Sequence, residues 1–518
     1  MQGHKKSISL IVFFIFIISC KISTNTEKEP NNTFANANKI SINNEITGYL
    51  ESENDTDCFI VDVDQEQILK IALSGIKGVN HAVSIYRNEN PGPVLIKVID
   101  DNRKSSPETF ANLYVEPGQY FFTISHGSRD IKKGNTETPY KLNITSRSYL
   151  NEEKEPDDTI FSATEISDKS IIIGYFSPAQ NTMNNDPKTK MQELDFFKFN
   201  ISITDNIPVL INVRLTGVTG VDSVLSLLTG TMEELHIADN AGSSESEMIS
   251  DFGIKESGTY YIRVSSKNFL VNHEIPYELT LEYKQYDQNS ELESNNSFDK
   301  SNLILNNIIT GRISNSGDSD FFHFVPQFKN RFYKATCSGA SGLDIVMTIY
   351  DNNHNKLFEI NNSGAGEPEK IPYFMVKNPI YISVTALSLS SPESEYTLAL
   401  EQYDSNEILE VEPNNSKNTA NILNNRITGF ITYRNDIDYY LLKFTEKQRV
   451  KLTVRGVKNG RIKISTTDPL GFIIKSKEIN ADEEVSFNEI FDKKGFLIVE
   501  SAVPDFEFPY TITVEELQ

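Results

Sequence analysis

The chain has 518 residues, a formal net charge of −23, three cysteines and no tryptophan. Such acidity disfavours nucleic acid and anionic membrane surfaces as partners, because the attraction to phosphate groups that drives such binding is reversed. The length predicts about three to five domains, and an exported chain with so few cysteines must be held together by its hydrophobic cores.

The first twenty residues have the features of a bacterial export signal. Lys5 and Lys6 precede an unbroken apolar run over residues 10–18, which has the length of a signal-peptide core and is too short to span a bilayer. The run ends at Ile17-Ile18-Ser19-Cys20, which resembles a lipobox that has isoleucine where leucine is preferred. The alternative is an ordinary secretory signal with a chance cysteine.

We therefore expect residues 1–19 to be a signal peptide and residues 20–26 to be a lipidated cysteine with a tether. Cys20 would carry the lipid, palmitate included, which anchors the chain to a membrane without spanning it. The expected location is the outer membrane or the cell surface, in preference to the inner membrane.

A short acidic signature occurs four times. Each copy reads Glu-x-Glu, then Pro or Ser, two Asn or Asp residues, and Thr or Ser. The copies begin 126, 138 and 119 residues apart, which is the length of a whole domain, so the pattern predicts four copies of one domain. The first residues of the four copies are Glu27, Glu153, Glu291 and Glu410.

Each copy continues with the same series of features. An apolar residue follows the signature by seven positions, then comes a glycine, expected just before a short strand, and then an acidic pair that leads into aromatic residues. Alternating apolar and polar residues with glycine-centred turns follow, and a closing strand begins with a tyrosine. The glycines are Gly48, Gly174, Gly311 and Gly429, and the tyrosines are Tyr140, Tyr277, Tyr396 and Tyr510.

Several short strands about ten residues apart, without sustained helical periodicity, predict antiparallel β-sandwiches. The fold class is therefore expected to be all-β, with four tandem sandwiches after the signal peptide. The expected domains are residues 27–147, 148–285, 286–403 and 404–518.

The aromatic residues after each acidic pair recur in the copies, which indicates core residues. A stacking platform for sugar is the alternative, but aromatic residues that face a partner should vary among copies. The absence of tryptophan also favours the core interpretation. Cys58 and Cys337 lie at different places in the repeat, within strand-like stretches, and are expected to be free and buried.

Three elements together resemble the bacterial pre-peptidase C-terminal domain: the Glu-x-Glu-Pro-Asn-Asn-Thr entry, the Asp-x-Asp-aromatic strand, and Gly-Thr-Tyr-Tyr-Ile-Arg-Val at 258–264. The resemblance covers nearly all of the chain after the signal segment and departs most in the third copy, where Ser294 replaces the proline and Asn378-Pro379 replaces Gly-Thr. It implies a jelly-roll-like sandwich of secreted proteins, usually accessory to a peptidase. The family is related to the collagen-binding domains of clostridial collagenases, in which the entry segment and a facing acidic loop hold calcium.

The signature and the acidic pair supply oxygen ligands of the kind that calcium prefers. Alternation places both glutamates and the first Asn or Asp of the signature on one face of an extended segment, and carboxylates that meet there would repel unless a cation or a basic side chain compensated them. The candidate calcium ligands are Glu27, Glu29, Asn31, Asp55, Asp57, Glu153, Glu155, Asp157, Glu193, Asp195, Glu291, Glu293, Asn295, Asp318, Asp320, Glu410, Glu412, Asn414, Asp436 and Asp438.

Structural capping is the alternative interpretation of the same residues. Asp and Asn stabilise loops through side-chain to backbone hydrogen bonds, so the first acid of each pair would start a turn. If calcium binds, it would stiffen the joints between domains, because the first glutamate lies where two repeats meet. Calcium is the only cofactor that the pattern suggests.

No motif for catalysis is present in the sequence. None of the seven histidines recurs among the repeats, and there is no Gly-x-Ser-x-Gly, His-Glu-x-x-His or phosphate-loop pattern. The expected function is therefore a non-catalytic, lipid-anchored binding array for protein or glycan, with no nucleic-acid partner. The alternatives are a structural envelope stalk and an accessory partner of a separately encoded peptidase.

Overall fold

The structure is a computed structural model that describes residues 25–100, 102–127, 132–177, 194–315, 317–387, 391, 393–503 and 505–517. The expected signal peptide, Cys20 and the candidate ligand Glu193 lie outside these residues. In the described part of the chain, no helix has both the length and the apolar character needed to cross a membrane.

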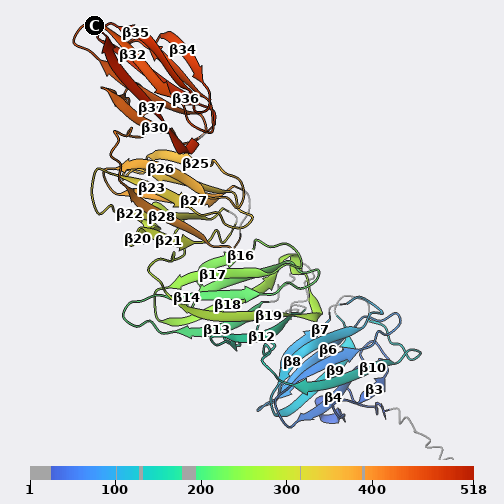
Figure 1. Ribbon diagram of the computed structural model, residues 1–518. Coiled ribbons are helices and arrows are strands. Elements are labelled where there is room, and N and C mark those ends of the chain that lie inside the picture. The colour runs from blue at the N-terminus through green and yellow to red at the C-terminus, as the bar shows by residue number, and fades with distance from the viewer. Residues whose placement is uncertain are drawn as a thin grey trace, which may run out of the picture. The chain divides into compact units, whose positions relative to one another are not determined.

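Strands make up 55% of the chain and helical turns 2%, which confirms the all-β fold (Figure 1). The sheets occur in pairs that follow one another along the chain, so the fold is a series of tandem sandwiches. The chain divides into two compact units. The first comprises the residues up to Leu150 with Lys154–Pro156 and Ser177, and the second comprises the remaining described residues from Asn151 onward.

The first unit holds one sandwich of two five-stranded sheets. The 3-10 turn η1, Phe34–Asn36, follows the acidic signature. One sheet has the order β1 (Asn25–Thr26), β3 (Glu45–Gly48), β10 (Tyr140–Ser148), β5 (Gln67–Leu73) and β8 (Glu108–Val115). The other has the order β2 (Asn38–Lys39), β4 (Thr56–Val63), β9 (Gly118–His126), β6 (His81–Asn88) and β7 (Pro93–Ile99).

The second unit holds three sandwiches, each with one five-stranded and one four-stranded sheet. The second repeat has β11 (Thr164–Glu165), β13 (Asp195–Ile201), β18 (Gly258–Ser266), β15 (Ser223–Thr229) and β16 (Glu234–Ala238), facing β12 (Ser170–Phe176), β19 (Asn272–Gln285), β14 (Val209–Leu215) and β17 (Glu247–Ile254), with η2 at Lys267–Phe269.

The third and fourth repeats have the same strand order. The third has η3 (Phe298–Lys300), then β20 (Asn302–Ile304), β22 (Ser319–Phe324), β27 (Ile380–Ala386), β24 (Ile345–Tyr350) and β25 (Lys356–Ile360), facing β21 (Ile308–Gly311), β28 (Tyr396–Tyr403), β23 (Arg331–Cys337) and β26 (Glu369–Val376). The fourth has β29 (Asn421–Ile422), β31 (Asp436–Lys443), β36 (Lys494–Ser501), β33 (Ile462–Thr467) and β34 (Ile473–Ile479), facing β30 (Arg426–Ile431), β37 (Asp505–Leu517), β32 (Gln448–Arg455) and β35 (Glu484–Phe491).

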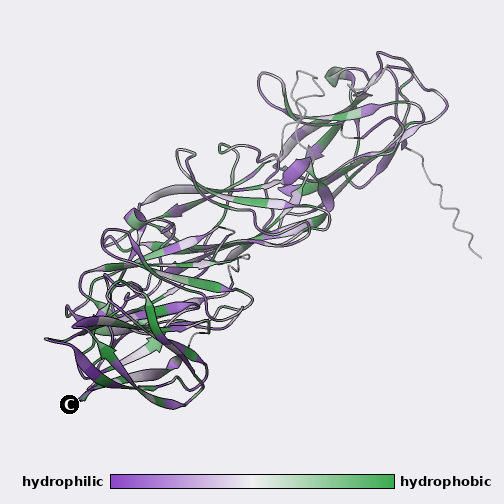
Figure 2. Cartoon of the chain, turned by 90° about the horizontal axis from the view of Figure 1, so that it is seen from above, coloured by the Kyte–Doolittle hydropathy of each residue, from purple (hydrophilic) through white to green (hydrophobic). Residues whose placement is uncertain are grey.

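Each pair of sheets encloses its own hydrophobic core. In the first sandwich Phe59 and Phe122 of one sheet and Ile71 and Ile144 of the other belong to one buried cluster. Three further clusters of the same kind fill the other sandwiches. Hydrophilic and hydrophobic segments both occur along the strands (Figure 2), as period-two patterning of half-buried strands requires. Cys58 and Cys337 are free and buried, as expected.

The aromatic residues after the acidic pairs are only partly core, because consecutive side chains of a strand face opposite ways. Phe322 and Tyr440, the second of their pairs, are fully buried. Phe321 and Tyr439, the first of their pairs, are half-buried on the outer face. The expectation that both aromatics fill the core was therefore right for the second residue and for Phe196, which is buried in a small separate cluster, and wrong for Phe321 and Tyr439.

The recurring glycines lie inside strands rather than in front of them. Gly48 ends β3, and in each repeat the glycine pairs across the sheet with the tyrosine that opens the closing strand. A Cβ on Gly48 would lie 2.2 Å from the hydroxyl oxygen of Tyr140. The glycine is therefore required because the tyrosine side chain of the neighbouring strand lies too close for a Cβ. From the sequence pattern alone, the same glycine was expected to lie before the strand.

Each sandwich begins one or two residues before the first glutamate of its signature. Asn25 and Thr26 form β1 and pair in parallel with β3, so the expected tether already joins the sheet at its end. Glu152, Ser290 and Leu409 form isolated parallel bridges at the corresponding positions. The signature is consequently part of the sandwich that follows it.

Candidate metal centre

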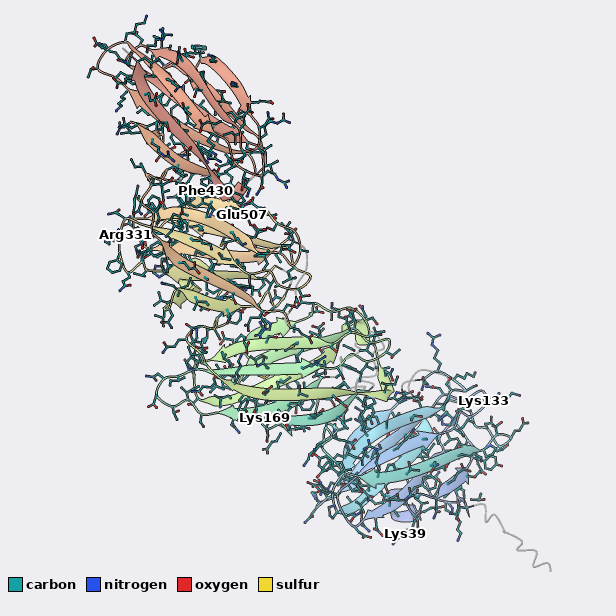
Figure 3. All side chains as sticks on the ribbon, in the orientation of Figure 1. Lys39, Lys133, Lys169, Arg331, Phe430 and Glu507 are labelled. Carbon is teal, nitrogen blue, oxygen red and sulfur yellow. The ribbon has the colours of Figure 1, made fainter. Side chains whose placement is uncertain are left out.

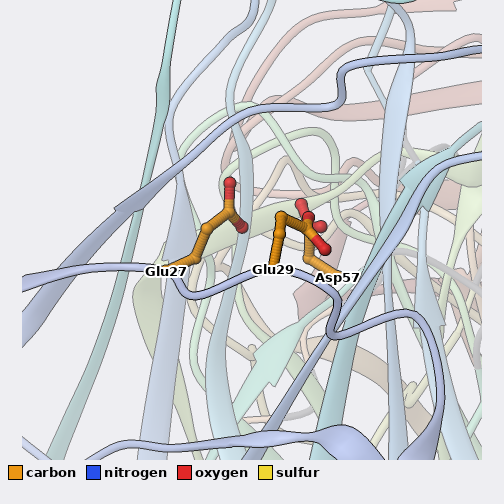
Figure 4. Close-up of side chains that lie close together, drawn as sticks. All are labelled: Glu27, Glu29 and Asp57. Atoms are coloured by element: carbon orange, nitrogen blue, oxygen red, sulfur yellow. The ribbon is translucent and has the colours of Figure 1, made fainter.

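The four acidic signatures build the same side-chain cluster at the entry of each sandwich. In the first sandwich Glu27 and Glu29 direct their carboxylates to one side of the entry segment, beside Asp57 of β4 (Figure 4). One ligand atom from each of the three lies within 4.8 Å of the others. The same holds for Glu291, Glu293 and Asp320 in the third repeat and for Glu410, Glu412 and Asp438 in the fourth.

The tyrosine that opens the closing strand ties each cluster together. The Tyr140 hydroxyl is 2.8 Å from Glu27 Oε2 and 2.7 Å from Asp57 Oδ2. Tyr396 and Tyr510 hold the corresponding aspartates, Asp320 and Asp438, in the same way. These tyrosines are fully buried. Their recurrence is visible in the sequence but their place in the site is not, since Tyr140 lies 113 residues after Glu27 and Tyr510 lies 100 residues after Glu410.

A backbone N–H fixes the other oxygen of the first glutamate. The donor is the residue after the recurring glycine: Arg312 N donates to Glu291 Oε1 at 2.6 Å, and Phe430 N donates to Glu410 Oε1 at 2.7 Å. A Cβ on Gly311 would lie 2.5 Å from Glu291 Oε2. The glycine thus admits the carboxylate as well as the tyrosine.

An asparagine clamps the residue between the two glutamates. Asn421 Oδ1 accepts from Val411 N at 2.7 Å, and its Nδ2 donates to Val411 O at 3.0 Å. Asn38 and Asn302 make the same pair of bonds to Lys28 and Leu292. The sequence shows asparagine in this link, but the reason for its position appears only when the link lies against the entry segment.

Several inward-facing oxygens of the third and fourth clusters have no hydrogen-bond donor among the described residues. In the third they are Glu293 Oε1, Asn295 Oδ1 and Asp320 Oδ1. In the fourth they are the equivalent oxygens of Glu412, Asn414 and Asp438. All six side chains are at least nine-tenths buried. Buried acceptors without donors are costly, so three converging acceptors in each cluster indicate a place for a cation.

The amide nitrogen of each asparagine holds its oxygen toward the centre. Asn414 Nδ2 donates to Glu410 Oε2 at 3.2 Å, and Asn295 Nδ2 donates to Glu291 Oε2 at 3.4 Å. In the first sandwich the Asn31 amide fits the surrounding carboxylates best with its nitrogen toward them, where it donates to Asp57 Oδ1 at 3.1 Å. The amide in that position can therefore face a cation with oxygen or a carboxylate with nitrogen.

Burial, and after it the repulsion between neighbouring carboxylates, raises the pKa of the clustered carboxyls. Burial, followed by repulsion from Glu27, raises the pKa of Asp57 to about 9 although Tyr140 donates to it. Burial and then repulsion from Asp318 raise the pKa of Glu293 to about 8. Burial and then Glu410 raise the pKa of Asp438 well above its usual range. A divalent cation would supply the compensation that these carboxylates lack.

The first acid of each pair has a different role. Asp318 Oδ2 accepts from Ser314 N at 2.7 Å, and Asp436 Oδ2 accepts from Thr432 N at 2.7 Å. Asp55 accepts from Glu51 N at 2.5 Å. These aspartates close the loop before the strand, so the structure places them as turn caps beside the cluster, which is the capping arrangement considered from the sequence.

The second repeat has a carboxylate where the others have asparagine. The Tyr277 hydroxyl is 2.7 Å from Glu153 Oε2 and also bonds Asp195, and Asp157 accepts from Thr164 Oγ1 at 3.1 Å. Glu155 belongs to the segment Lys154–Pro156, which is counted with the first compact unit. This repeat therefore offers more negative charge than the other three.

Within the second unit, the preceding repeat covers the cluster of the next one. Glu293 forms a parallel bridge with Phe252 of β17. The Tyr373 hydroxyl of β26 donates to Thr428 O at 3.0 Å and lies 3.4 Å from Glu410 Oε1. By contrast, Glu29 in the first sandwich is exposed. The clusters at these two joints are therefore closed, and the first is open to solvent.

The clusters together offer what a hard divalent cation requires. Calcium takes six to eight oxygen ligands from carboxylates, amide carbonyls and water, and the clusters of the first, third and fourth repeats each supply two glutamates, one aspartate and one asparagine side chain. Fold and site thus define a class: tandem all-β sandwiches with a recurring acidic cluster at the entry of each.

Comparisons with known proteins add similarity to solved sandwich structures. No family model matches the chain, and no curated protein matches it. The pre-peptidase C-terminal domain of collagenase from Bacillus anthracis is similar at 21% identity, covering 21% of this chain and 94% of that one with a TM-score of 0.18. A triple jelly-roll protein of an archaeal virus and a protein of the Sulfolobus turreted icosahedral virus each match at 14% identity and a TM-score of 0.18, covering 62% and 63% of this chain and 80% and 82% of theirs.

Proposed function

We propose that the chain is a non-catalytic binding array of pre-peptidase C-terminal-like sandwiches, anchored to the cell envelope by a lipid on Cys20. In this proposal the sandwiches present protein- or glycan-binding faces outside the cytoplasm, and calcium stiffens the joints between them. The observation that carries the proposal is a contrast among the repeats. The cores and the acidic clusters recur, whereas the histidines and lysines around the outer aromatic rings differ.

The third repeat has the most distinctive outer face. Phe298 stacks on His354 at 4.0 Å between ring centroids, and the ring of Tyr381 lies 5.3 Å from Phe298 and 4.6 Å from His323. Phe321 and Tyr350 extend the same group. These six residues, the aromatic face of the third repeat, are half-buried or exposed. His323 and His354 are the members of this face that the first repeat lacks, and accessible rings of this kind are those that a partner would use.

The corresponding surface of the first repeat shares part of this arrangement. Phe34 packs there on Tyr86 and Phe121, in the places that Phe298, Tyr350 and Tyr381 take in the third repeat. The fourth repeat differs, since its Phe496 ring lies beneath the ammonium groups of Lys417 and Lys494. The repeats thus share a scaffold and differ in the side chains that surround these rings, which is compatible with a binding array.

Binding to immobilised matrix proteins and polysaccharides tests this function. We expect the full chain to bind at least one of them and a Tyr381→Ala variant to lose about tenfold in affinity, since an aromatic anchor supplies much of the energy of such contacts. The matched control is Met375→Ala, a half-buried residue of the same repeat that lies outside the aromatic face. Absence of binding to every matrix protein and polysaccharide would favour the structural-stalk alternative.

Terbium luminescence tests calcium binding in the clusters. The chain has no tryptophan, and Tyr440 and Tyr510 both bond Glu410, so these tyrosines would sensitise terbium bound there. We expect luminescence that calcium displaces, a higher melting temperature with calcium than with chelator, and weaker signals in Asp438→Asn. Glu359→Gln on the exposed surface is the control. An unchanged melting temperature together with no sensitised emission would leave structural capping as the role of these residues.

A further inference from the structure

The β33–β34 hairpin of the fourth repeat ends in an apolar tip. The side chains around its turn are largely exposed: Leu470 is 76% exposed, Phe472 71%, Ile473 61% and Ile474 48%. Four exposed apolar side chains within five residues of one turn are uncommon on a soluble surface, where contiguous apolar patches mark sites of interaction. β34 is labelled in Figure 1.

Polar contacts hold the backbone of this tip in place. Asp468 Oδ1 accepts from Gly471 N at 2.7 Å and from Phe472 N at 2.9 Å. The Asp468 N–H donates to Phe472 O at 3.1 Å, and Lys417 Nζ donates to Leu470 O. The turn is therefore fixed by hydrogen bonds, and its apolar side chains take no part in fixing it.

The same hairpin in the other three repeats has a polar tip. The turn residues are Glu-Asn-Pro-Gly at 89–92 between β6 and β7, and Gly-Thr-Met-Glu at 230–233 between β15 and β16. Between β24 and β25 they are Asp-Asn-Asn-His-Asn at 351–355. Since three copies of the fold form this hairpin with at most one large apolar residue at the tip, the sandwich itself does not require an apolar tip.

Basic side chains surround the base of the apolar tip. Ile473 and Phe496 both pair with Thr467, so Lys494 and its neighbour Lys493 lie at the tip end of the sheet. Lys443 pairs with Lys494. These three lysines are exposed, as is Lys417, and the acids on the same end are Asp468, Glu446 and Asp492.

The fourth repeat is also less acidic than the chain as a whole. Residues 404–518 contain 15 Lys and Arg against 19 Asp and Glu, a net charge of −4, whereas the whole chain carries −23. An anionic surface therefore repels this repeat only weakly. The lysines at the tip supply a local attraction to such a surface.

We propose that the β33–β34 tip of the fourth repeat docks on a phospholipid surface, inserting Leu470, Phe472 and Ile473 below the headgroups while the surrounding lysines contact lipid phosphates. A membrane is favoured over a protein partner because the apolar residues lie at a turn instead of lining a groove, and the four lysines at this end of the sheet suit an anionic interface. This contact goes beyond the binding array and is independent of calcium and of the lipid on Cys20.

A single tryptophan reports on the proposed contact. The chain has none, so Phe472→Trp in the full chain with Cys20→Ser gives a fluorophore at the tip that no lipid anchor can carry to the membrane. Vesicles of phosphatidylethanolamine with phosphatidylglycerol, with or without brominated acyl chains, are the probe. The matched control places the tryptophan at the polar tip of the third repeat, Asn353→Trp.

We expect blue-shifted emission and quenching by brominated lipid for Phe472→Trp and neither for Asn353→Trp. Adding Leu470→Ser and Ile473→Ser should weaken vesicle binding about tenfold or more, since each removes a large apolar side chain from the interface. Replacing phosphatidylglycerol by phosphatidylcholine, or Lys493 and Lys443 by glutamate, should weaken it further. The proposal would be overturned if vesicles left the emission of Phe472→Trp unchanged. If a soluble protein shifted the emission and vesicles did not, the tip would be assigned to a protein partner.

Discussion

The recurring glycine, tyrosine and first glutamate form one interdependent group of residues. The tyrosine hydroxyl reaches the carboxylates only because no Cβ stands between the strands. The carboxylate is accepted in a buried position only because the tyrosine and a backbone N–H donate to it. Substituting any of the three is therefore expected to disturb the other two.

Gly311→Ala tests this dependence in the third repeat. The added methyl group would lie 2.5 Å from both Glu291 Oε2 and the Tyr396 hydroxyl, and overpacking of this kind costs about 1–3 kcal/mol. We expect the unfolding midpoint of this repeat in urea, followed by hydrogen exchange of β21 and β28, to fall accordingly. Gly364→Ala, where no atom lies within 4 Å of the new Cβ, should leave it nearly unchanged, and equal effects of the two substitutions would contradict the packing argument.

His81 makes the first sandwich sensitive to pH. The ring is almost fully buried between strands, opposite His126 and near Asp100, and neither ring nitrogen has a hydrogen-bond partner among the described side chains and backbone. Burial lowers its pKa. The unfolded chain therefore binds a proton more readily than the folded one, and stability present above the usual histidine pKa of about 6.5 is lost as the pH falls below it.

His81→Leu should reduce this loss. Hydrogen exchange of β6 and β9 at pH 7.5 and 5.5 measures how much folding stability is lost as the pH falls. We expect this loss to be smaller in the variant by roughly 1 kcal/mol. A pH dependence that is identical in both chains would show that His81 is not its source.

Element by element, the joints within the second unit have different chemistry. Asp251 of β17 forms an ion pair with Arg312 of the third repeat. At the next joint Tyr373 of β26 packs edge-on against Phe430 at 5.0 Å between centroids, in a cluster with Leu409; Phe430 is labelled in Figure 3. Arg312 and Phe430 both follow the recurring glycine, so the same position is charged at one joint and aromatic at the other.

Tyr373→Ala should loosen the joint between the third and fourth repeats. The substitution removes a side chain that is 2% exposed and its hydrogen bond to Thr428 O, contacts whose loss in a buried setting costs about 3–5 kcal/mol. We expect cleavage of the connection at residues 404–408 to become at least about tenfold faster in limited proteolysis of the full chain. Met375→Ala on the same strand is the control, and unchanged cleavage in Tyr373→Ala would mean that this contact does not hold the joint.

For the whole molecule, the attachment to a membrane is expected to depend on Cys20. We expect the full chain to partition into the membrane fraction of bacterial cells and to remain there after a high-salt wash. Cys20→Ala should be released by that wash, since the remaining contact through the hairpin tip is reversible, whereas an acylated cysteine adds about 0.8 kcal/mol for each buried methylene. Retention of Cys20→Ala after the wash would show that the lipobox is not what anchors the chain.

The sequence predicted most of the fold because its main signals are local and repeated. Alternation and glycine-centred turns predicted strands, and the recurrence of Glu27-x-Glu29 predicted how often the sandwich is built. The same alternation correctly placed the two glutamates and Asn31 on one face. Alternation did not predict which aromatic of each pair faces away from the core. That depends on which face of the strand's own sheet packs against the other sheet of the sandwich.

The sequence by itself determined the all-β class, the fourfold repetition and the acidic composition of each entry segment, since these follow from local pattern and spacing. The tertiary structure decided which oxygens converge, that Asp57 joins the cluster while Asp55 caps a loop, and that Tyr140, distant in the sequence, bridges the carboxylates. It also showed that the tip at Leu470 protrudes. The physical reason is that burial and convergence depend on pairing between strands far apart in the chain, which no local pattern specifies.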